Sequence, residues 1–477
     1  MRDALVEAYA TNPDLAGERA NLRANDENVP IARASGLPGV NSTGSFSQSV
    51  YDSGTNGAPS GISPTRTGNL GLDLSVPIYS GGSVRNSVRA AETRVEAGRA
   101  NLRGFEASVF TDVVTVYVDV LRDEAIVRLN QQNVHALDVN LQATRDRFEV
   151  GDLTRTDVAQ SEARLALAQS QLRSAEAQLI GSRENYIRIV GSPPGVLAQP
   201  PALPNLPADV NSAVDTALAS NPNLQAAQKA NDASTIDVDV ARAGRLPRVS
   251  VGVGGSYYNY LGSLSSQAAA LTGLRRGGFS TTAGVNLTLP LFQGGRPAAQ
   301  IRQAQERRGA AIETVTLTER GVIAQARSAF AAYQAALRVI ESSRVAVDAN
   351  KLSLEGVRAE NGVGTRTILD ILNAEQELLN AQVQYVTAER DAYVAGFTLL
   401  AVMGRAEARD LGLDGGALYD PTLHYRSVRG GWSDWADGDA PTAVGTRTNQ
   451  TPIQTPDVTA VTDPVLDAPV DSSRANP

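Results

Sequence analysis

The stretches GDLTRTDVAQS, residues 151–161, and GVGTRTILDIL, residues 362–372, contain the same triplet Thr-Arg-Thr. The two copies begin at Thr154 and Thr365, which are 211 positions apart. In each stretch the triplet follows a glycine and precedes an apolar pattern with helical spacing. A polar triplet that recurs in the same setting so far along the chain indicates equivalent places in two structural repeats.

Both stretches predict a turn between two helices. Gly151 and Gly362 are placed to end the first helix of each pair, because glycine readily takes the left-handed conformation found there. The second helix then begins at a capping box. The two capping boxes are Thr154-x-x-Asp157 and Thr367-x-x-Asp370.

Further landmarks support an internally duplicated chain. Asn12-Pro13 matches Asn221-Pro222, and Leu37-Pro38 matches Leu246-Pro247, at an offset of 209 residues. The segment VPIYSGG, which ends at Gly82, matches LPLFQGG at an offset of 213. An offset that drifts around 210 indicates small insertions within one duplicated unit.

Composition and charge exclude several classes of function. The chain has 477 residues, 42% hydrophobic and 20% charged, which is enough for a sizeable core. Its net charge of -8 and its lack of a basic block argue against nucleic-acid binding. There is no cysteine, and His135 and His424 are too far apart for a metal motif. We therefore expect no metal, no cofactor and no enzymatic activity, since no Ser-His-Asp set can be assembled.

The sequence predicts no transmembrane helix, which needs about 18 or more consecutive apolar residues. The N-terminal stretch MRDALVEAYATNPDL is amphipathic and acidic near its start, so it is not typical of a signal peptide. If the protein is exported, we expect that its leader has been removed.

Apolar and polar residues alternate in NLGLDLSVPIY, residues 69–79, and again in residues 279–291. Period two predicts strands with one apolar and one polar face, and each half contributes one hairpin. Such strands suit a transmembrane barrel, although a half-buried soluble sheet remains the alternative. Small barrels need about eight strands, so four must be pooled between subunits or serve another purpose. The residues predicted to face lipid are Leu70, Leu72, Leu74, Val76, Ile78, Val285, Leu287 and Leu289.

Long segments without internal proline follow each strand pair, over residues 83–150 and 298–361. As helices they would be roughly 100 Å long at about 1.5 Å per residue, and their charges require water and other helices around them. In the returning helices, large residues recur every seven positions from Val158 to Tyr186 and from Leu372 to Leu400, with small residues on other faces. Helices contacted from two sides fit the wall of a tube, whereas a plain coiled coil or four-helix bundle is the alternative.

With these features the sequence resembles the TolC-type outer-membrane channels of Gram-negative efflux and type I secretion systems. The resemblance runs from about residue 3 to residue 404 and rests on the duplicated halves, the NPDL and NPNL helix starts, the two strand ends, and above all GVGTRTILDIL followed by NAEQELLNAQ. It implies a mainly α fold with a transmembrane β part. Long antiparallel coiled coils would form an α-barrel, and two β-hairpins per protomer would complete a twelve-stranded β-barrel in a homotrimer.

The resemblance also implies how the chain is divided. In order, the segments are a first-half N-terminal helix (1–36), outer-membrane β-hairpin 1 (37–80), long periplasmic helical hairpin 1 (81–190), an equatorial linker (191–210), a second-half helix (211–245), outer-membrane β-hairpin 2 (246–293), long periplasmic helical hairpin 2 (294–404), an equatorial collar (405–436) and a disordered tail (437–477). Disorder in the tail also follows from its lack of aromatic residues. In the collar, Trp432 and Trp435 are expected to belong to a packed segment.

The same resemblance implies a gate at the periplasmic tip of the tube. Asp157 and Arg366 fall at positions that resemble a polar and ionic lock between neighbouring coiled coils, with Thr156 beside them, and Asp370 would contribute to an acidic ring. On a threefold axis each residue occurs three times. One carboxylate per chain thereby becomes a ring that attracts cations and repels anions.

The chain departs from the family pattern at two positions near this tip. Asn361 stands where a tyrosine often joins the lock, and Asn373 where a second aspartate ring can occur. An exposed ion pair contributes only about 0 to 1 kcal/mol, so several together are needed to bias closure. We expect a lock that is weaker or differently wired.

The resemblance implies a passive exit channel in the outer membrane, extending into the periplasm, for a tripartite type I secretion or multidrug efflux system. Its partners would be outer-membrane lipid, a periplasmic adaptor whose contact opens the channel, and an inner-membrane ABC or proton-driven transporter that supplies the energy. Two alternatives stay open. One is a soluble periplasmic coiled-coil adaptor or scaffold, and the other is an enzyme built on a helical bundle.

Overall fold

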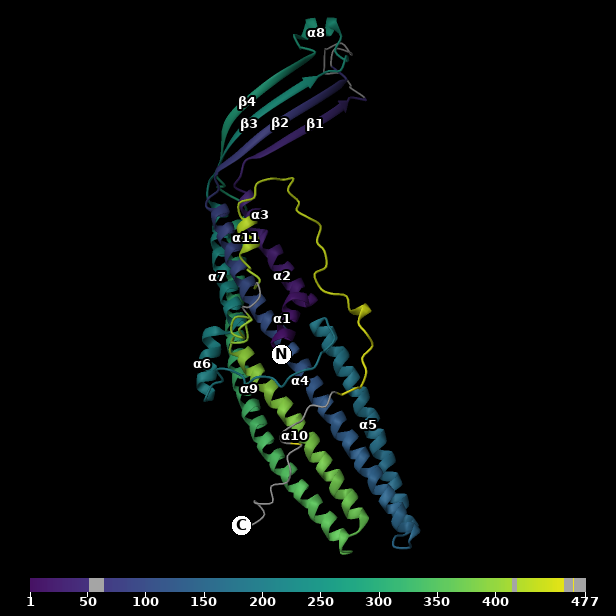
Figure 1. Ribbon diagram of the computed structural model, residues 1–477. Coiled ribbons are helices and arrows are strands. Elements are labelled where there is room, and N and C mark those ends of the chain that lie inside the picture. Colours follow the sequence, from purple (N-terminus) through teal and green to yellow (C-terminus); the bar gives the residue numbers. More distant parts are fainter. Residues whose placement is uncertain (51–63, 414–417, 459–465, 467–477) are drawn as a thin grey trace.

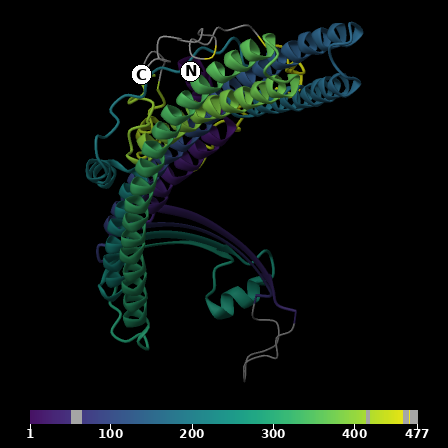
Figure 2. The same ribbon diagram turned by 90° about the horizontal axis from the view of Figure 1, so that it is seen from below.

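The computed structural model describes residues 1–50, 64–413, 418–458 and residue 466. Figure 1 shows an elongated molecule with a β-sheet at one end, a tall stack of helices below it, and two helical hairpin tips at the other end. Seen along the perpendicular direction, both the sheet and the row of helices are curved (Figure 2). None of the helices in the described ranges is long and apolar enough to cross a membrane.

The helices that precede the sheet are shorter than predicted. We expected one helix over residues 1–36 and one over residues 211–245, but these segments are divided at Asn12 and Asn221. At each of these positions the backbone is extended and the asparagine side chain caps the next helix, which has proline at its first position. The Asn-Pro steps therefore begin helices, as expected of the NPDL and NPNL helix starts, but they also separate helices. The elements are α1 (Arg2–Thr11), α2 (Pro13–Asp26), α3 (Asn28–Ala34), α6 (Val210–Ser220), α7 (Pro222–Arg242) and a 3₁₀ turn (Ala243–Arg245).

The two predicted hairpins form a single antiparallel sheet in the order β1-β2-β3-β4, because β2 and β3 also pair with each other. Leu289, predicted as a strand residue, lies just beyond the end of β4, and a short helix within the second hairpin loop was not anticipated. Most of the first hairpin loop, residues 51–63, lies outside the described residues. The strands are β1 (Gly39–Gln48), β2 (Arg66–Tyr79), β3 (Arg248–Asn259) and β4 (Gly277–Thr288), and the short helix is α8 (Ser266–Thr272).

The register of the sheet gathers apolar side chains on one face. Val40, Leu74, Val253 and Ala283 pair in one row across the four strands, and the adjacent row holds Asn41, Asp73, Gly254 and Thr282 on the opposite face. Among the described residues, this apolar face is left largely exposed. Among the residues predicted to face lipid, Leu74 and Val76 are half-buried, and the others are between 51% and 69% exposed.

Four long helices make up the rest of the molecule: α4 (Ser83–Glu149), α5 (Arg155–Val190), α9 (Arg296–Gly362) and α10 (Ile368–Val402). α4 packs on α5 and α9 on α10, while α7 lies against both α4 and α9, and α10 also touches α4. Both α4 and α9 have 67 residues, so each is roughly 100 Å long. This agrees with the length predicted from the sequence.

The heptad pattern predicts the packing of these helices well. In α5, the large residues Leu165, Leu179 and Tyr186 are buried, and so are the small residues Ala168 and Ser182. In α10 the predicted large positions are buried or partly buried, and the alanines on the other side are covered as well. Both faces of α10 are therefore in contact with neighbouring helices within one chain.

The repeat is displaced by two residues from the match that the triplet suggested. Thr154 and Thr367 are the equivalent N-caps, at an offset of 213 residues, whereas the triplets align at 211. Correspondingly, Gly151 and Gly364 both take φ of +84°, while Gly362 is the last residue of α9. The prediction that Gly362 ends the helix in a left-handed conformation was wrong by two positions, because the turn geometry selects Gly364.

The collar and tail differ from their predictions. Within the collar, α11 (Leu423–Val428) packs near α2, but Trp432 and Trp435 are not packed. The described part of the tail has no helix or strand beyond a 3₁₀ turn. It nevertheless lies along the helices, because Arg183 of α5 donates to the carbonyl of Asp457 at 2.8 Å and Leu466 is buried against α4, α9 and α10. The tail contacts the helical body over this part.

Gly404 offers a test of the junction after α10. Its φ is +68°, and an added Cβ would lie 2.4 Å from the carbonyl oxygen of Ser220. We expect the Gly404→Ala protein to unfold at a lower temperature, because the left-handed conformation alone costs an L residue about 1–2 kcal/mol. Circular dichroism at increasing temperature measures the effect.

Gly309→Ala is the matched control, since no atom lies within 4 Å of the Cβ position in α9. Alanine is favoured over glycine within a helix by about 1 kcal/mol. Equal unfolding midpoints for the two variants would contradict the structural role of Gly404.

Candidate functional site at the helical tips

The first tip joins α4 to α5 and contains Asp157. One oxygen of this carboxylate, Oδ2, accepts hydrogen bonds from the backbone N–H of Thr154 at 2.9 Å and from its hydroxyl at 2.7 Å. The Asp157 N–H in turn donates to Thr154 Oγ1 at 3.3 Å, which completes the capping box. Hydrogen bonds from the side chain and then the backbone of Thr154 lower the pKa of Asp157. Thr156, beside it, is exposed.

The second tip joins α9 to α10 and has the same construction. Asp370 accepts from the Thr367 N–H at 2.9 Å and from its hydroxyl at 2.8 Å, and these bonds lower the pKa of Asp370. Arg366 pairs with Glu360 at 2.8 Å, and this hydrogen bond raises the pKa of the guanidinium. Asn361 donates to the carbonyl of Arg366 at 2.8 Å and so supports the turn from within.

The predicted gate residues are thus placed at the two tips, but they do not bond to one another within one chain. Asp157 is engaged by Thr154 and Arg366 by Glu360, each inside its own turn. Their side chains are close to solvent, and Arg366 is half exposed. Any ionic contact between Asp157 and Arg366 therefore has to come from a second copy of the chain or from a rearrangement.

Other residues connect the two tips, and the sequence did not single them out. Arg164 of α5 donates to Asn373 Oδ1 of α10 at 2.8 Å, and Arg147 of α4 donates to Asn361 Oδ1 of α9 at 3.5 Å. The two asparagines that depart from the family pattern are therefore the acceptors for arginines of the first hairpin. Both arginines are only partly exposed and lie outside the apolar heptad positions, so heptad patterns alone do not reveal them.

A buried carboxylate adds a third connection. Glu375 of α10 is 5% exposed, and its Oε1 accepts from Asn140 of α4 at 2.7 Å and from Arg358 of α9 at 2.9 Å. Its Oε2 is buried without a partner. Removing one partner of such a buried group is costly, since a charge is left uncompensated. A glutamate at a core position of the heptad pattern is the sequence signal for this contact.

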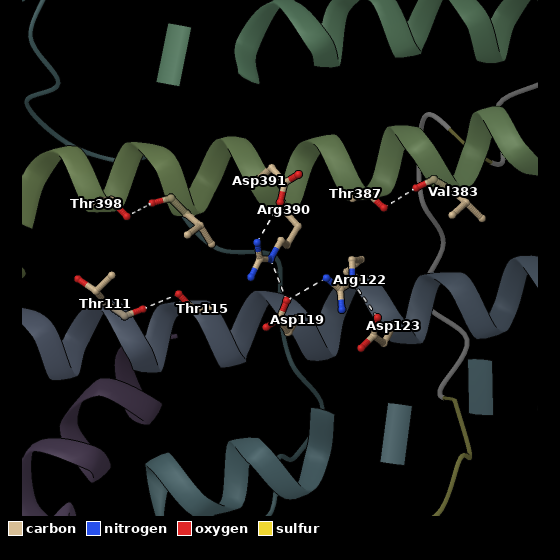
Figure 3. A network of polar contacts seen from close by, with 11 residues as sticks. Thr111, Thr115, Asp119, Arg122, Asp123, Val383, Thr387, Arg390, Asp391 and Thr398 are labelled. Carbon is tan, nitrogen blue, oxygen red and sulfur yellow. Dashed lines mark hydrogen bonds and ion pairs between the residues drawn. The ribbon is translucent and has the colours of Figure 1, made fainter. Parts of the chain in front are cut away.

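Nearer the middle of the helices, an ionic network joins α4 to α10 (Figure 3). Asp119 of α4 receives Arg390 of α10 at 2.8 Å and Arg122 of its own helix at 3.1 Å. Arg390 also pairs with Asp391 at 2.9 Å, and Arg122 with Asp123 at 2.8 Å. Two arginines and three aspartates thus form four ion pairs, and the pair between Arg390 and Asp119 joins the two coiled coils far from the tips.

Within the described ranges, no group of three or more histidine, aspartate or glutamate side chains is placed to hold a metal ion. His424 instead lies 3.1 Å from Glu27 through its Nε2. The polar residues of the tips form caps, ion pairs and contacts between helices. This arrangement suits the binding and release of neighbouring helices.

The cap at the first tip can be tested on its own. Replacing the N-cap residue in Thr154→Ala is expected to remove about 1 kcal/mol of helix stability, because an orphan N–H at the start of α5 loses its acceptor. Amide hydrogen exchange at residues 155–158 should become faster. Thr156→Ala is the matched control from the same turn, and equally fast exchange in that variant would contradict the assignment of the cap.

A family model described as outer membrane efflux protein matches residues 4–192 and 213–405 of the chain. Outer membrane efflux protein BepC of Brucella suis biovar 1 is 36% identical over 433 residues, which cover 91% of each chain. Outer membrane protein TolC of Escherichia coli strain K12 is 26% identical, with 85% of this chain and 82% of that protein covered.

The fold is shared with solved channels. The crystal structure of the Campylobacter jejuni CmeC outer membrane channel superposes with a TM-score of 0.72, at 17% identity, over 90% of this chain and 89% of that one. The two family matches coincide with the two halves that contain the helical tips. The chain therefore belongs to the outer membrane efflux protein family, to which the TolC channels belong.

Proposed function

We propose that the protein is a passive exit channel in the outer membrane for a tripartite type I secretion or multidrug efflux system. The observation that carries this proposal is the apolar face of the sheet. Leu70, Leu72, Ile78, Val285 and Leu287 are all more than half exposed. Lipid is the environment that such a face fits.

The sheet also has two free edges, at β1 and β4. Three copies joined edge to edge would make twelve antiparallel strands, and such closure removes the edges. In this arrangement residues 37–80 and 246–293 lie in the membrane, residues 81–190 and 294–404 form the periplasmic tube, and residues 191–210 and 405–436 surround it. The repeated order of elements supports an origin of the two halves by duplication.

The gate of this channel is assigned to the tips. Asp157, Thr156 and Arg366 would form the lock between neighbouring subunits, and Asp370 an acidic ring at the entrance. Support comes from the equivalent positions of Asp157 and Asp370 in the two turns and from the exposure of Thr156 and Arg366. The contacts of Asn361 with Arg147, Asn373 with Arg164 and Glu375 with Asn140 would hold the two hairpins of one subunit together in the closed state.

A channel of this kind does no chemistry itself. The energy for transport would come from an inner-membrane ABC or proton-driven transporter, and contact with a periplasmic adaptor would separate the tips. The pairs there are exposed and worth about 0 to 1 kcal/mol each, so a docking protein can displace them. A soluble adaptor or scaffold is disfavoured because the sheet leaves its apolar face uncovered.

The behaviour of the purified protein distinguishes a channel from a soluble adaptor or scaffold. The channel is expected to require detergent, to have the mass of three chains in native mass spectrometry, and to conduct ions in planar lipid bilayers. A protein that stays monomeric and soluble without detergent would instead be an adaptor or scaffold. It would also fail to conduct.

The gate makes a separate prediction. Asp157→Asn and Arg366→Gln are each expected to raise the single-channel conductance in planar bilayers, because each removes a charge from the closed tip. Arg173→Gln is a matched control, since it removes an arginine whose partner, Glu176, lies within the same helix. Thr154→Ala is a second control that weakens the cap but keeps the charge of Asp157. Unchanged conductance would leave Asp157 as a helix cap only.

A further inference from the structure

The tryptophan loop, residues 429–437, follows α11 and contains Trp432 and Trp435, the two tryptophans of the chain. Their side chains are 86% and 93% exposed. Tyrosines in the same part of the chain behave differently, because Tyr419 and Tyr425 lie against Arg19 and Arg99. The exposure of both indoles is therefore a property of this loop and needs an explanation.

The base of the loop is fixed close to the point where the chain enters the sheet. Arg33 at the end of α3 donates to the carbonyl of Arg429 at 2.9 Å, and Arg33 is six residues before Gly39, the first residue of β1. His424 contacts Glu27 of α2 at 3.1 Å. The tryptophans are thus within a few residues of an anchored backbone.

Figure 1 shows the direction of the loop. The yellow trace that leaves α11 rises toward the level at which the strands meet the helices, and then descends along the helical body. At this level the ends of β2 and the residues after β4 carry further exposed apolar side chains, among them Tyr79, Leu291 and Phe292, the last two at 88% and 89% exposure. The loop and the lower border of the apolar face lie at a similar height.

We infer that the tryptophan loop is a peripheral membrane anchor, which inserts Trp432 and Trp435 into the headgroup region of the periplasmic leaflet. Indole rings are enriched at membrane-water interfaces because they have a large apolar body and one polar N–H. Asp434, which lies between the two tryptophans, would be excluded from hydrocarbon, so the loop fits the headgroup level and not the bilayer core.

This inference rests on the proposed function, since it needs the sheet to be in a membrane. It adds an attachment outside the barrel, which comes from the collar and reaches the bilayer from its periplasmic side. Because Arg33 and Arg429 connect the loop to the helix that leads into β1, the anchor would resist tilting of the helical tube relative to the membrane.

The chain carries its own reporters, because its tryptophan emission comes from this loop alone. The full-length protein is reconstituted into vesicles of phosphatidylethanolamine and phosphatidylglycerol. Its tryptophan fluorescence is compared with that of the protein in detergent without lipid. We expect a blue shift of the emission in vesicles and protection from acrylamide. Lipids brominated near the glycerol end of the acyl chain should quench more strongly than lipids brominated near the chain end.

Trp432→Ser and Trp435→Ser each leave a single reporter, and both remaining indoles should show the same behaviour. The matched control is Val150→Trp in the protein that lacks both native tryptophans, because Val150 is 81% exposed at the tip far from the sheet. Its emission should stay accessible to acrylamide and insensitive to brominated lipid.

Two results would overturn the anchor while leaving the channel intact. One is an ion-conducting sample whose native tryptophans are not quenched by brominated lipid. The other is a blue-shifted emission that is the same in detergent and is insensitive to bromine, which would show that a neighbouring subunit covers the indoles. A chain that neither inserts nor conducts would overturn the proposed function and the anchor together.

Discussion

The apolar face of the four-stranded sheet is the constraint on which the rest of the structure depends. Its register aligns Val40, Leu74, Val253 and Ala283 on one side, and no helix in the described part of the chain covers them. Among the described residues, the two edge strands each have a strand partner on one side only. Removing this apolar surface from water and pairing these backbone groups are both favourable, and one chain does neither alone. A sheet of this kind fits the lipid and the neighbouring subunits that we propose for it.

The long helices also have apolar surface to bury, and they bury it against other helices of the same chain. α10 carries large residues on one side and alanines on another, so its neighbours approach it from two directions. Small residues allow the close approach and large ones supply the buried area. Charges also specify which helices pack together. Asp119 of α4 pairs with Arg390 of α10, and both side chains are only about one-fifth exposed. This ion pair lies far from the tips.

At the tips, the hydrogen bonds that cap each turn are separate from the contacts that join one hairpin to the other. Each capping box is complete within its own hairpin, so Asp157 and Asp370 keep their hydrogen bonds if the hairpins move apart. The contacts between hairpins are Arg147 with Asn361, Arg164 with Asn373, and Asn140 with the buried Glu375. Motion of one hairpin against the other therefore breaks side-chain contacts without unfolding a helix. Such independence of local and tertiary contacts suits the gate that we propose at the tips.

Local features were predictable from the sequence to within a few residues. The Asn-Pro caps, the capping boxes at Thr154 and Thr367, and the 67-residue helices all follow from propensities that act over one or two turns. Errors arose where geometry beyond one turn decides. The repeated triplet suggested an offset of 211, whereas the left-handed turn at Gly364 sets it at 213. Leu289 continues the alternation of β4, but pairing with β3 ends at Thr288.

By itself, the sequence determined the period of each segment, and with it which elements are strands, which are helices and which of their faces are apolar. Only the tertiary structure decided which surfaces meet. It pairs β2 with β3, brings Arg164 to Asn373, buries Glu375 and leaves the two tryptophans of the collar in the open. The physical reason is that periodicity is set by neighbours three or four residues away, whereas these contacts join side chains that are separated by up to several hundred residues and depend on how whole helices pack.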